Sequence, residues 1–159
     1  MEKIKIVIAD DTEPILRYVE KIIKDTNEFE IVGTAKDGKE LVQIVLSCNP
    51  DIVITDEQMP NLTGREAIKL LNENNIKTKY ILITGFDDVT MYSCLNELNI
   101  SKVIKKPILD ATHFINQIKN VVNSNREDTF KDEIQEENEN NKGNVTKSKS
   151  FFRNIFGKK

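Results

Sequence analysis

The feature that most limits how this chain can fold is an alternation of short apolar runs and amphipathic stretches that continues to residue 123. The apolar runs, rich in Ile, Val and Leu, cover residues 4–9, 29–35, 51–55, 79–84 and 102–104. The first, third and fourth are nearly continuous, which is typical of strands covered on both faces of a parallel sheet. The stretches between the runs repeat apolar residues three and four positions apart, as a helix with one buried face does.

This alternation predicts an α/β fold, with a doubly wound five-stranded parallel sheet flanked by five helices. Four of the helices are expected at residues 13–25, 37–48, 65–73 and 111–122, and another between the last two strands. Thr12, Asp37 and Asp110 precede three of these helices and are candidate N-caps, because their side-chain oxygens can accept from the first backbone N–H groups.

The chain has 159 residues and a formal net charge of −3, which suits one domain with a substantial core. We expect that domain at residues 1–123. Its basic residues do not cluster, so we expect it to make no contact with nucleic acid. Residues 124–147 are polar and Asn-rich, which predicts a flexible, disordered linker. Residues 148–159 form a short basic, aromatic and amphipathic C-terminal segment.

The two cysteines, Cys48 and Cys94, each lie inside a helical pattern. We expect small, buried, reduced thiols rather than a disulfide. No apolar run approaches the length that spans a bilayer. The N-terminal apolar stretch is too short and too interrupted by charge for a signal peptide. These features predict a cytoplasmic location.

Polar residues follow the predicted strands at the ends where ligands bind in open parallel sheets. They are Asp10 and Asp11 after the first strand, Asp56 at the end of the third, Thr84 at the end of the fourth and Lys106 after the fifth. Three carboxylates brought together repel one another and call for a cation, and an all-oxygen set suits Mg²⁺. A hydroxyl and an ammonium can bind phosphoryl oxygens, and a carboxylate beside them can attack phosphorus.

These residues and their spacing resemble the receiver domain of two-component response regulators over about residues 3–123. The motifs are the acidic pair DD after the first strand, DEQMPNLTG at residues 56–64, TG after the fourth strand and KP after the fifth. The resemblance implies the flavodoxin-like receiver fold. All four motifs occur in order and at strand ends, so the local and global signals agree.

The resemblance also implies a role for each matching residue. Asp56 is the expected phosphoacceptor, with Thr84 and Lys106 bound to its phosphoryl group. The expected Mg²⁺ ligands are Asp10, Asp11, Asp56 and the backbone carbonyl of Gln58, with Asp10 acting partly through water. Lys106 is expected to precede a cis peptide bond to Pro107.

Each site residue also has a simpler interpretation. Asp10 or Asp11 can cap the first helix, Thr84 can bond to local backbone, and Lys106 can be a solvated cation. His113, the only histidine, is expected to be an exposed bystander.

Two other functions are compatible with parts of this pattern. One is a phosphatase of the haloacid dehalogenase type, but the Asp-x-Asp spacing that this family needs is missing from the run ADDTEP. The other is a scaffold that keeps the fold and works independently of phosphorylation.

The chain departs from the family pattern at Val103. Receivers usually carry Tyr or Phe three residues before the final Lys, and that ring turns inward on activation. A branched aliphatic side chain cannot repeat this movement. We hypothesise that Thr84 still moves and that repacking around Val103 and the fourth helix transmits the change.

The expected function is that of a single-domain response regulator. It receives phosphate from a histidine kinase or phosphotransfer protein and binds a target through the fourth helix, fifth strand and fifth helix. Beyond its own phosphotransfer and dephosphorylation it is not expected to be an enzyme. Residues 124–159 are too few and too polar for a DNA-binding output domain.

Residues 147–159 suggest one further contact. If helical, this segment places four apolar side chains on one face, and basic residues flank them. It can lie peripherally in an anionic membrane interface, dock in a partner's groove, remain inert, or fold back on the acidic linker. The apolar residues are Phe151, Phe152, Ile155 and Phe156.

Overall fold

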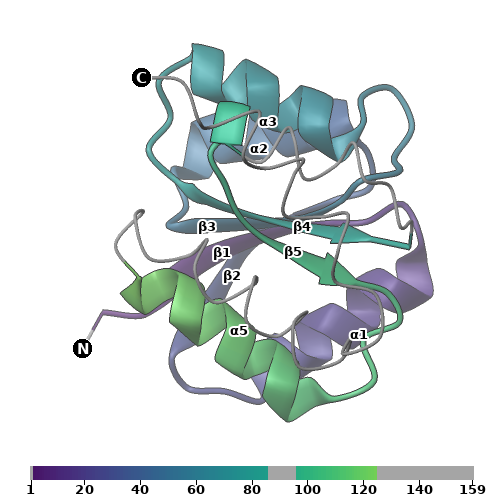
Figure 1. Cartoon of the computed structure of the whole chain (residues 1–159), viewed down its shortest axis with the longest axis vertical. Helices are drawn as coiled ribbons and strands as arrows, with labels where there is room; N and C mark the ends of the chain where they lie inside the picture. Colours follow the sequence, from purple (N-terminus) through teal and green to yellow (C-terminus); the bar gives the residue numbers. More distant parts are fainter. Residues whose placement is uncertain (1, 86–95, 125–159) are drawn as a thin grey trace, which may run out of the picture. The chain divides into compact units, whose positions relative to one another are not determined.

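The computed structural model describes residues 2–85 and 96–124 of the chain. Five strands form a single sheet in the order β2-β1-β3-β4-β5 (Figure 1). Every neighbouring pair in this sheet is parallel. The strands are β1 Ile4–Ala9, β2 Phe29–Ala35, β3 Ile52–Asp56, β4 Lys79–Thr84 and β5 Ile100–Lys105.

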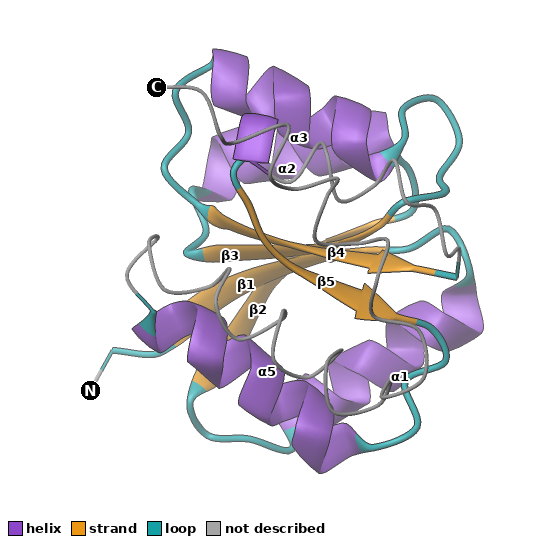
Figure 2. Ribbon diagram, viewed as in Figure 1, coloured by secondary structure: helices purple, strands orange, loops and turns teal. Residues whose placement is uncertain are grey.

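Helices cover both faces of the sheet, α2 and α3 on one face and α1 and α5 on the other (Figure 2). Their bounds are α1 Glu13–Lys24, α2 Gly38–Cys48, α3 Gly64–Glu73 and α5 Ala111–Asn123. The predicted doubly wound α/β fold is confirmed, with strand bounds within two residues of those expected. The helix expected between β4 and β5 falls mainly on residues 86–95, outside the described residues.

The two faces of the sheet form two separate cores, which explains why the central strands are continuously apolar. In β1, Ile6 and Ile8 pack in one core with buried residues of α1 and α5. Val7 and Ala9 pack in the other core with buried residues of α2 and α3. Successive strand residues point to opposite faces, so a strand buried on both sides has no polar positions in its centre.

The three predicted N-caps occupy the expected positions, but they do not all use their side chains. Asp37 accepts from the backbone N–H of Glu40 at 2.8 Å, and Asp110 accepts from that of His113 at 2.9 Å. Thr12 is the N-cap of α1, yet its side chain makes no cap hydrogen bond. His113 is exposed, as predicted.

One prediction about the cysteines is wrong. Cys48 is exposed rather than buried, because the buried face of α2 ends at Val45 and its last turn lies outside the core. Cys94, residues 125–147 of the linker predicted at 124–147, and the predicted C-terminal segment at 148–159 lie outside the described residues. Within the described ranges, no helix has the length and apolar character that crossing a bilayer requires.

Candidate functional site

The predicted site residues meet at the carboxyl-terminal edge of the sheet. Asp10 directly follows β1, Asp56 ends β3, Thr84 ends β4 and Lys106 directly follows β5. Because all strands are parallel, these four ends lie at the same edge. The chain leaves β1 toward β2 on one side and returns to β3 on the other. The site therefore lies at the point where the winding of the sheet reverses.

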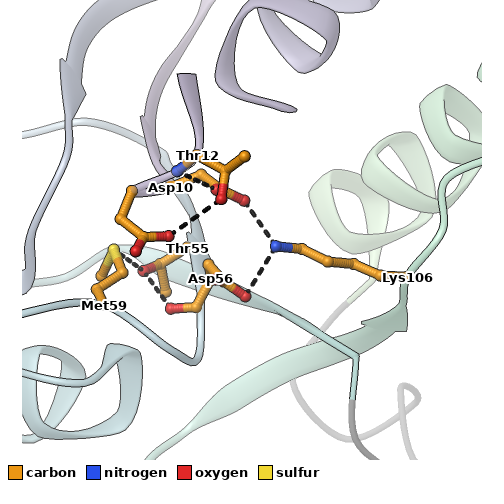
Figure 3. Close-up of polar contacts among 7 residues, drawn as sticks. Asp10, Thr12, Thr55, Asp56, Met59 and Lys106 are labelled. Carbon is orange, nitrogen blue, oxygen red and sulfur yellow. Dashed lines mark hydrogen bonds and ion pairs between the residues drawn. The ribbon is translucent and has the colours of Figure 1, made fainter. Parts of the chain in front are cut away.

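Lys106 joins the carboxylates of two different strand ends (Figure 3). Its Nζ lies 2.8 Å from Oδ2 of Asp10 and 3.1 Å from Oδ1 of Asp56. Asp10 and Asp56 are buried, at 3% and 6% exposure. Asp10 is further held by the backbone N–H of Thr12, which donates to its Oδ1 at 2.8 Å. Asp10 therefore does bond to the start of α1, as its simpler interpretation suggested, but it is also part of the site.

The acidic cluster fits a divalent cation. Asp10, Asp11 and Asp56 each offer a carboxylate oxygen, and these three oxygens lie within 4.8 Å of one another. The ammonium of Lys106 contacts two of these carboxylates, so the cluster keeps an excess of negative charge, which a hard cation with oxygen ligands would neutralise. Asp11 is exposed, so the cluster opens to solvent on its side. The donor set suits the Mg²⁺ that the sequence predicts.

The electrostatics of the site show the same excess of negative charge. Burial raises the pKa of the Asp56 carboxyl above its ordinary value, and the hydrogen bond and charge of Lys106 offset this only in part. The neighbouring charge of Asp10 also raises the pKa of Asp56. Burial acts to lower the pKa of Lys106, but its hydrogen bonds to Asp10 and Asp56 outweigh this and the pKa is raised. Lys106 therefore stays charged, while ionised Asp56 is incompletely compensated.

Thr84 and Pro107 lie where the sequence placed them. Thr84 is 1% exposed, and its carbonyl accepts from the backbone N–H of Lys106 at 2.7 Å, so the ends of β4 and β5 are joined at the site. The peptide bond between Lys106 and Pro107 is cis, as predicted. Gln58 is exposed in the loop that follows Asp56.

Close packing holds the backbone on both sides of Asp56. The hydroxyl of Thr55 donates to the carbonyl oxygen of Asp56 at 3.0 Å. A Cβ at Gly64 would lie against this same oxygen, so only glycine lets α3 begin so close to β3. The beginning of α3 is further stabilised by a capping box between Thr63 and Glu66.

A partly buried ion pair beside the predicted phosphoacceptor was not predicted from the sequence. Glu57 is 5% exposed, and its Oε1 lies 2.6 Å from Nε of Arg65. Burial raises the pKa of Glu57, and Arg65 offsets this only in part. The available signal was an acidic residue directly after a buried strand, with a basic residue at the start of the next predicted helix.

Comparison with known proteins identifies a family. The chain matches the family described as the response regulator receiver domain over residues 6–119. It is 30% identical to the protein-glutamate methylesterase/protein-glutamine glutaminase of Pyrococcus horikoshii over 132 residues, which are 83% of this chain and 33% of that protein. It is 31% identical to the transcriptional regulatory protein DegU of Brevibacillus brevis over 117 residues, which are 74% of this chain and 49% of that protein.

Solved structures agree with the family match. The response regulator domain of CheB from Thermotoga maritima superposes with a TM-score of 0.70 and 25% sequence identity, covering 78% of this chain and 99% of that domain. A Francisella response regulator receiver domain gives a TM-score of 0.67 at 24% identity, covering 75% and 96% of the two chains, and supports the fold alone.

The chain belongs to the response regulator receiver domain family of two-component systems. Members of this family are phosphorylated, typically bind Mg²⁺ in an acidic pocket, and interact with histidine kinases or phosphotransfer proteins. A receiver domain is not itself catalytic. The chain spans between a third and a half of the length of the two relatives above, so the methylesterase and transcriptional activities in their names are those proteins' own.

Proposed function

We propose that Asp56 is the phosphoacceptor of this receiver and that phosphorylation controls its contacts with other proteins. The observation that carries the proposal is the position of Lys106, whose ammonium lies within 3.1 Å of carboxylate oxygens of both Asp10 and Asp56. A cation at this place can hold a phosphoryl oxygen beside Asp56 without movement of the strands. The family membership supports the same role.

In the proposed reaction, a carboxylate oxygen of Asp56 attacks the phosphorus of a phosphohistidine. An O–P bond forms, the N–P bond breaks, and its electron pair leaves with the imidazole of the donor. Lys106 keeps the carboxylate in place and then pairs with a phosphoryl oxygen, and the hydroxyl of Thr84 donates to another. The product is an aspartyl phosphate, which water later hydrolyses to restore Asp56.

The proposed cation ligands are Asp10, Asp11, Asp56 and the backbone carbonyl of Gln58. Bound Mg²⁺ would neutralise charge on the acids and on the incoming phosphoryl oxygens. The residues of the chain supply the rest: Asp10 is held by Lys106 and by the backbone of Thr12, so it is already oriented when an ion arrives.

The test is the intact mass of the full chain after incubation with Mg²⁺ and a small-molecule phosphodonor. Wild type should gain one phosphoryl group, and Asp56→Asn none. Asp51→Asn is the matched control, because Asp51 is an exposed acid at the opposite end of β3, bonded to the backbone N–H of Lys5, and it should behave as wild type. A phosphoryl group on Asp56→Asn, or repeated turnover of a phosphate ester as a phosphatase would show, would contradict the proposal.

We propose that the phosphate donor is a histidine kinase or phosphotransfer protein and that the target binds over β5, α5 and the helix expected between β4 and β5. In this proposal the receiver passes its signal on through contacts with other proteins. If the chain were a scaffold that works independently of phosphorylation, Asp56→Asn would leave the affinity for its target unchanged. A loss of phosphorylation-dependent binding in Asp56→Asn supports the proposal.

We further propose a cytoplasmic location with peripheral membrane contact through residues 147–159. The aromatic and basic residues of this segment support the contact, since such segments bind anionic interfaces weakly. Sedimentation with anionic vesicles, with and without residues 147–159, tests it. Removal of the segment should shift the protein to the supernatant, and equal recovery there would contradict the membrane contact.

A further inference from the structure

Glu57, the residue after the proposed phosphoacceptor, is bonded to two elements at once. Its carboxylate accepts from Arg65 twice, from Nε at 2.6 Å and from the backbone N–H at 3.2 Å. Its backbone N–H donates to the carbonyl of Ile83 at 2.9 Å, and its own carbonyl accepts from the N–H of Gly64 at 3.0 Å. Glu57 is therefore joined to β4 on one side and to the first turn of α3 on the other.

These bonds close the base of the loop at residues 58–63, because they join the residues at its two ends. The loop is also held by contacts with the beginning of α2. The N–H of Gly38 donates to the carbonyl of Pro60 at 3.4 Å, and a Cβ at Gly38 would lie against the backbone of Leu62. Gln58, the first residue of the loop, lies directly next to the closed base.

The beginning of α3 does not explain why Glu57 is charged and buried. Thr63 and Glu66 already form a complete capping box there, so the helix has its own start signal. A partly buried ion pair is also a weak source of stability, because the desolvation of Glu57 offsets much of the attraction between the two charges. Unlike the capping box, the Glu57–Arg65 pair fixes the position of the backbone on each side of Glu57.

We propose that Glu57 and Arg65 are positioning residues for the cation site. Their ion pair holds the base of loop 58–63, and so holds the Gln58 carbonyl and Asp56 in place relative to Asp10 and Asp11. The inference rests on the proposed function, since it assumes that these groups bind Mg²⁺. Residues that orient metal ligands from outside typically contribute about 10- to 100-fold to metal affinity.

Calorimetric titration of the full chain with Mg²⁺ distinguishes a positioning role of the ion pair from an effect of its charges alone. In Arg65→Gln a positive charge near the site is lost, so an effect of charge alone would tighten Mg²⁺ binding. Positioning predicts the opposite, a loss of about tenfold. Glu57→Gln should weaken binding as well. With saturating Mg²⁺, the maximal rate of phosphorylation of both variants should return toward that of wild type.

Arg65→Lys is the second variant, and it is used if Arg65→Gln does not fold. It keeps the charge but not the fixed geometry of the guanidinium, so positioning predicts a loss of about threefold and charge alone predicts none. Lys79→Met is the control for general destabilisation, because Lys79 bonds to α5 and lies at the opposite end of the sheet. Its Mg²⁺ affinity should equal that of wild type.

The outcomes separate this inference from the proposed function. If wild type does not bind Mg²⁺, the proposed function itself fails. If wild type binds Mg²⁺ and the Arg65 variants bind it equally well or more tightly, the inference is overturned and the proposed function stands. An equal loss of affinity in Lys79→Met would likewise overturn it, because the effect would then be one of stability.

Discussion

At the scale of single residues, the site depends on an unequal distribution of charge. Lys106 is the cation in contact with two buried carboxylates, and a third carboxylate, that of Asp11, lies close by. The raised pKa of Asp56 shows that burial outweighs the attraction of Lys106. In the absence of Mg²⁺, the folded chain therefore holds Asp56 in an environment that opposes its ionised form.

We expect Asp56→Asn to stabilise the fold near pH 7 in buffer without Mg²⁺. A group whose pKa is higher in the folded than in the unfolded state stabilises the fold at low pH, and this contribution is lost as the pH rises through the folded pKa. Ionised Asp56 thus opposes folding at pH 7. The melting temperature of Asp56→Asn should therefore lie above that of wild type at pH 7, and the gain should vanish at a pH low enough to protonate the carboxyl in both the folded and the unfolded state.

Thermal melts across this pH range measure the effect, with Asp51→Asn as the control that should show no such gain. Adding Mg²⁺ should raise the melting temperature of wild type more than that of Asp56→Asn, because a ligand that binds the folded state stabilises it by mass action. A lower melting temperature for Asp56→Asn in the buffer without Mg²⁺ would contradict the inference that ionised Asp56 opposes folding.

At the scale of elements, a lysine from a strand completes the end of a helix. Nζ of Lys79, the first residue of β4, donates to the carbonyls of Val121 at 2.7 Å and Val122 at 2.9 Å. The last carbonyls of a helix have no partner within the helix, and a cation near them also interacts favourably with the helix dipole. Nothing in the local sequence of α5 predicts this contact, because the donor and the Val121 carbonyl are 42 positions apart in the chain.

Lys79→Met should lower the free energy of unfolding by about 1–2 kcal/mol, the value of losing hydrogen bonds from a charged group at a helix end. Urea unfolding measures this change, and hydrogen exchange should quicken first in the last turn of α5. Lys77→Met is the matched control, since Lys77 is exposed two residues earlier and its loss removes the same charge. Equal effects of the two substitutions would show that the contact with α5 does not stabilise the domain.

At the scale of the whole domain, the strand register offers a route by which phosphorylation can reach the β5 surface. Thr84 at the site pairs with Lys105, and two residues back Leu82 pairs with Val103. Val103 is partly buried and packs against the core on the α2 and α3 side. The aliphatic side chain that replaces the usual aromatic is therefore in contact with a packed core, where small shifts propagate.

Phosphorylation should change the NMR chemical shifts of Val103 and its neighbours in β5 as well as those near Asp56. Movement of Thr84 toward the phosphoryl group would pull on the paired end of β5, which is the physical reason for the expectation. Ile31 in β2, at the other side of the sheet, is the internal control and should change little. Shift changes confined to Asp56 and its adjoining loops would contradict this route.

The amino-acid pattern was enough to predict the five strands, the four described helices and the edge of the sheet at which the site forms. Hydrophobic periodicity is a local property, and in a parallel sheet it also places the residues after each strand at one edge. These two rules are enough to predict that Asp10, Asp56, Thr84 and Lys106 come together.

Which of these groups touch, and which neighbours support them, depends on how the elements pack in the folded domain. The contact between Lys106 and Asp10 joins residues 96 positions apart. The Glu57–Arg65 pair, the exposure of Cys48 and the bonds from Lys79 to α5 depend in the same way on how separate elements pack. Such contacts are set by register, packing and side-chain rotamers across elements, and a local pattern contains no information about them.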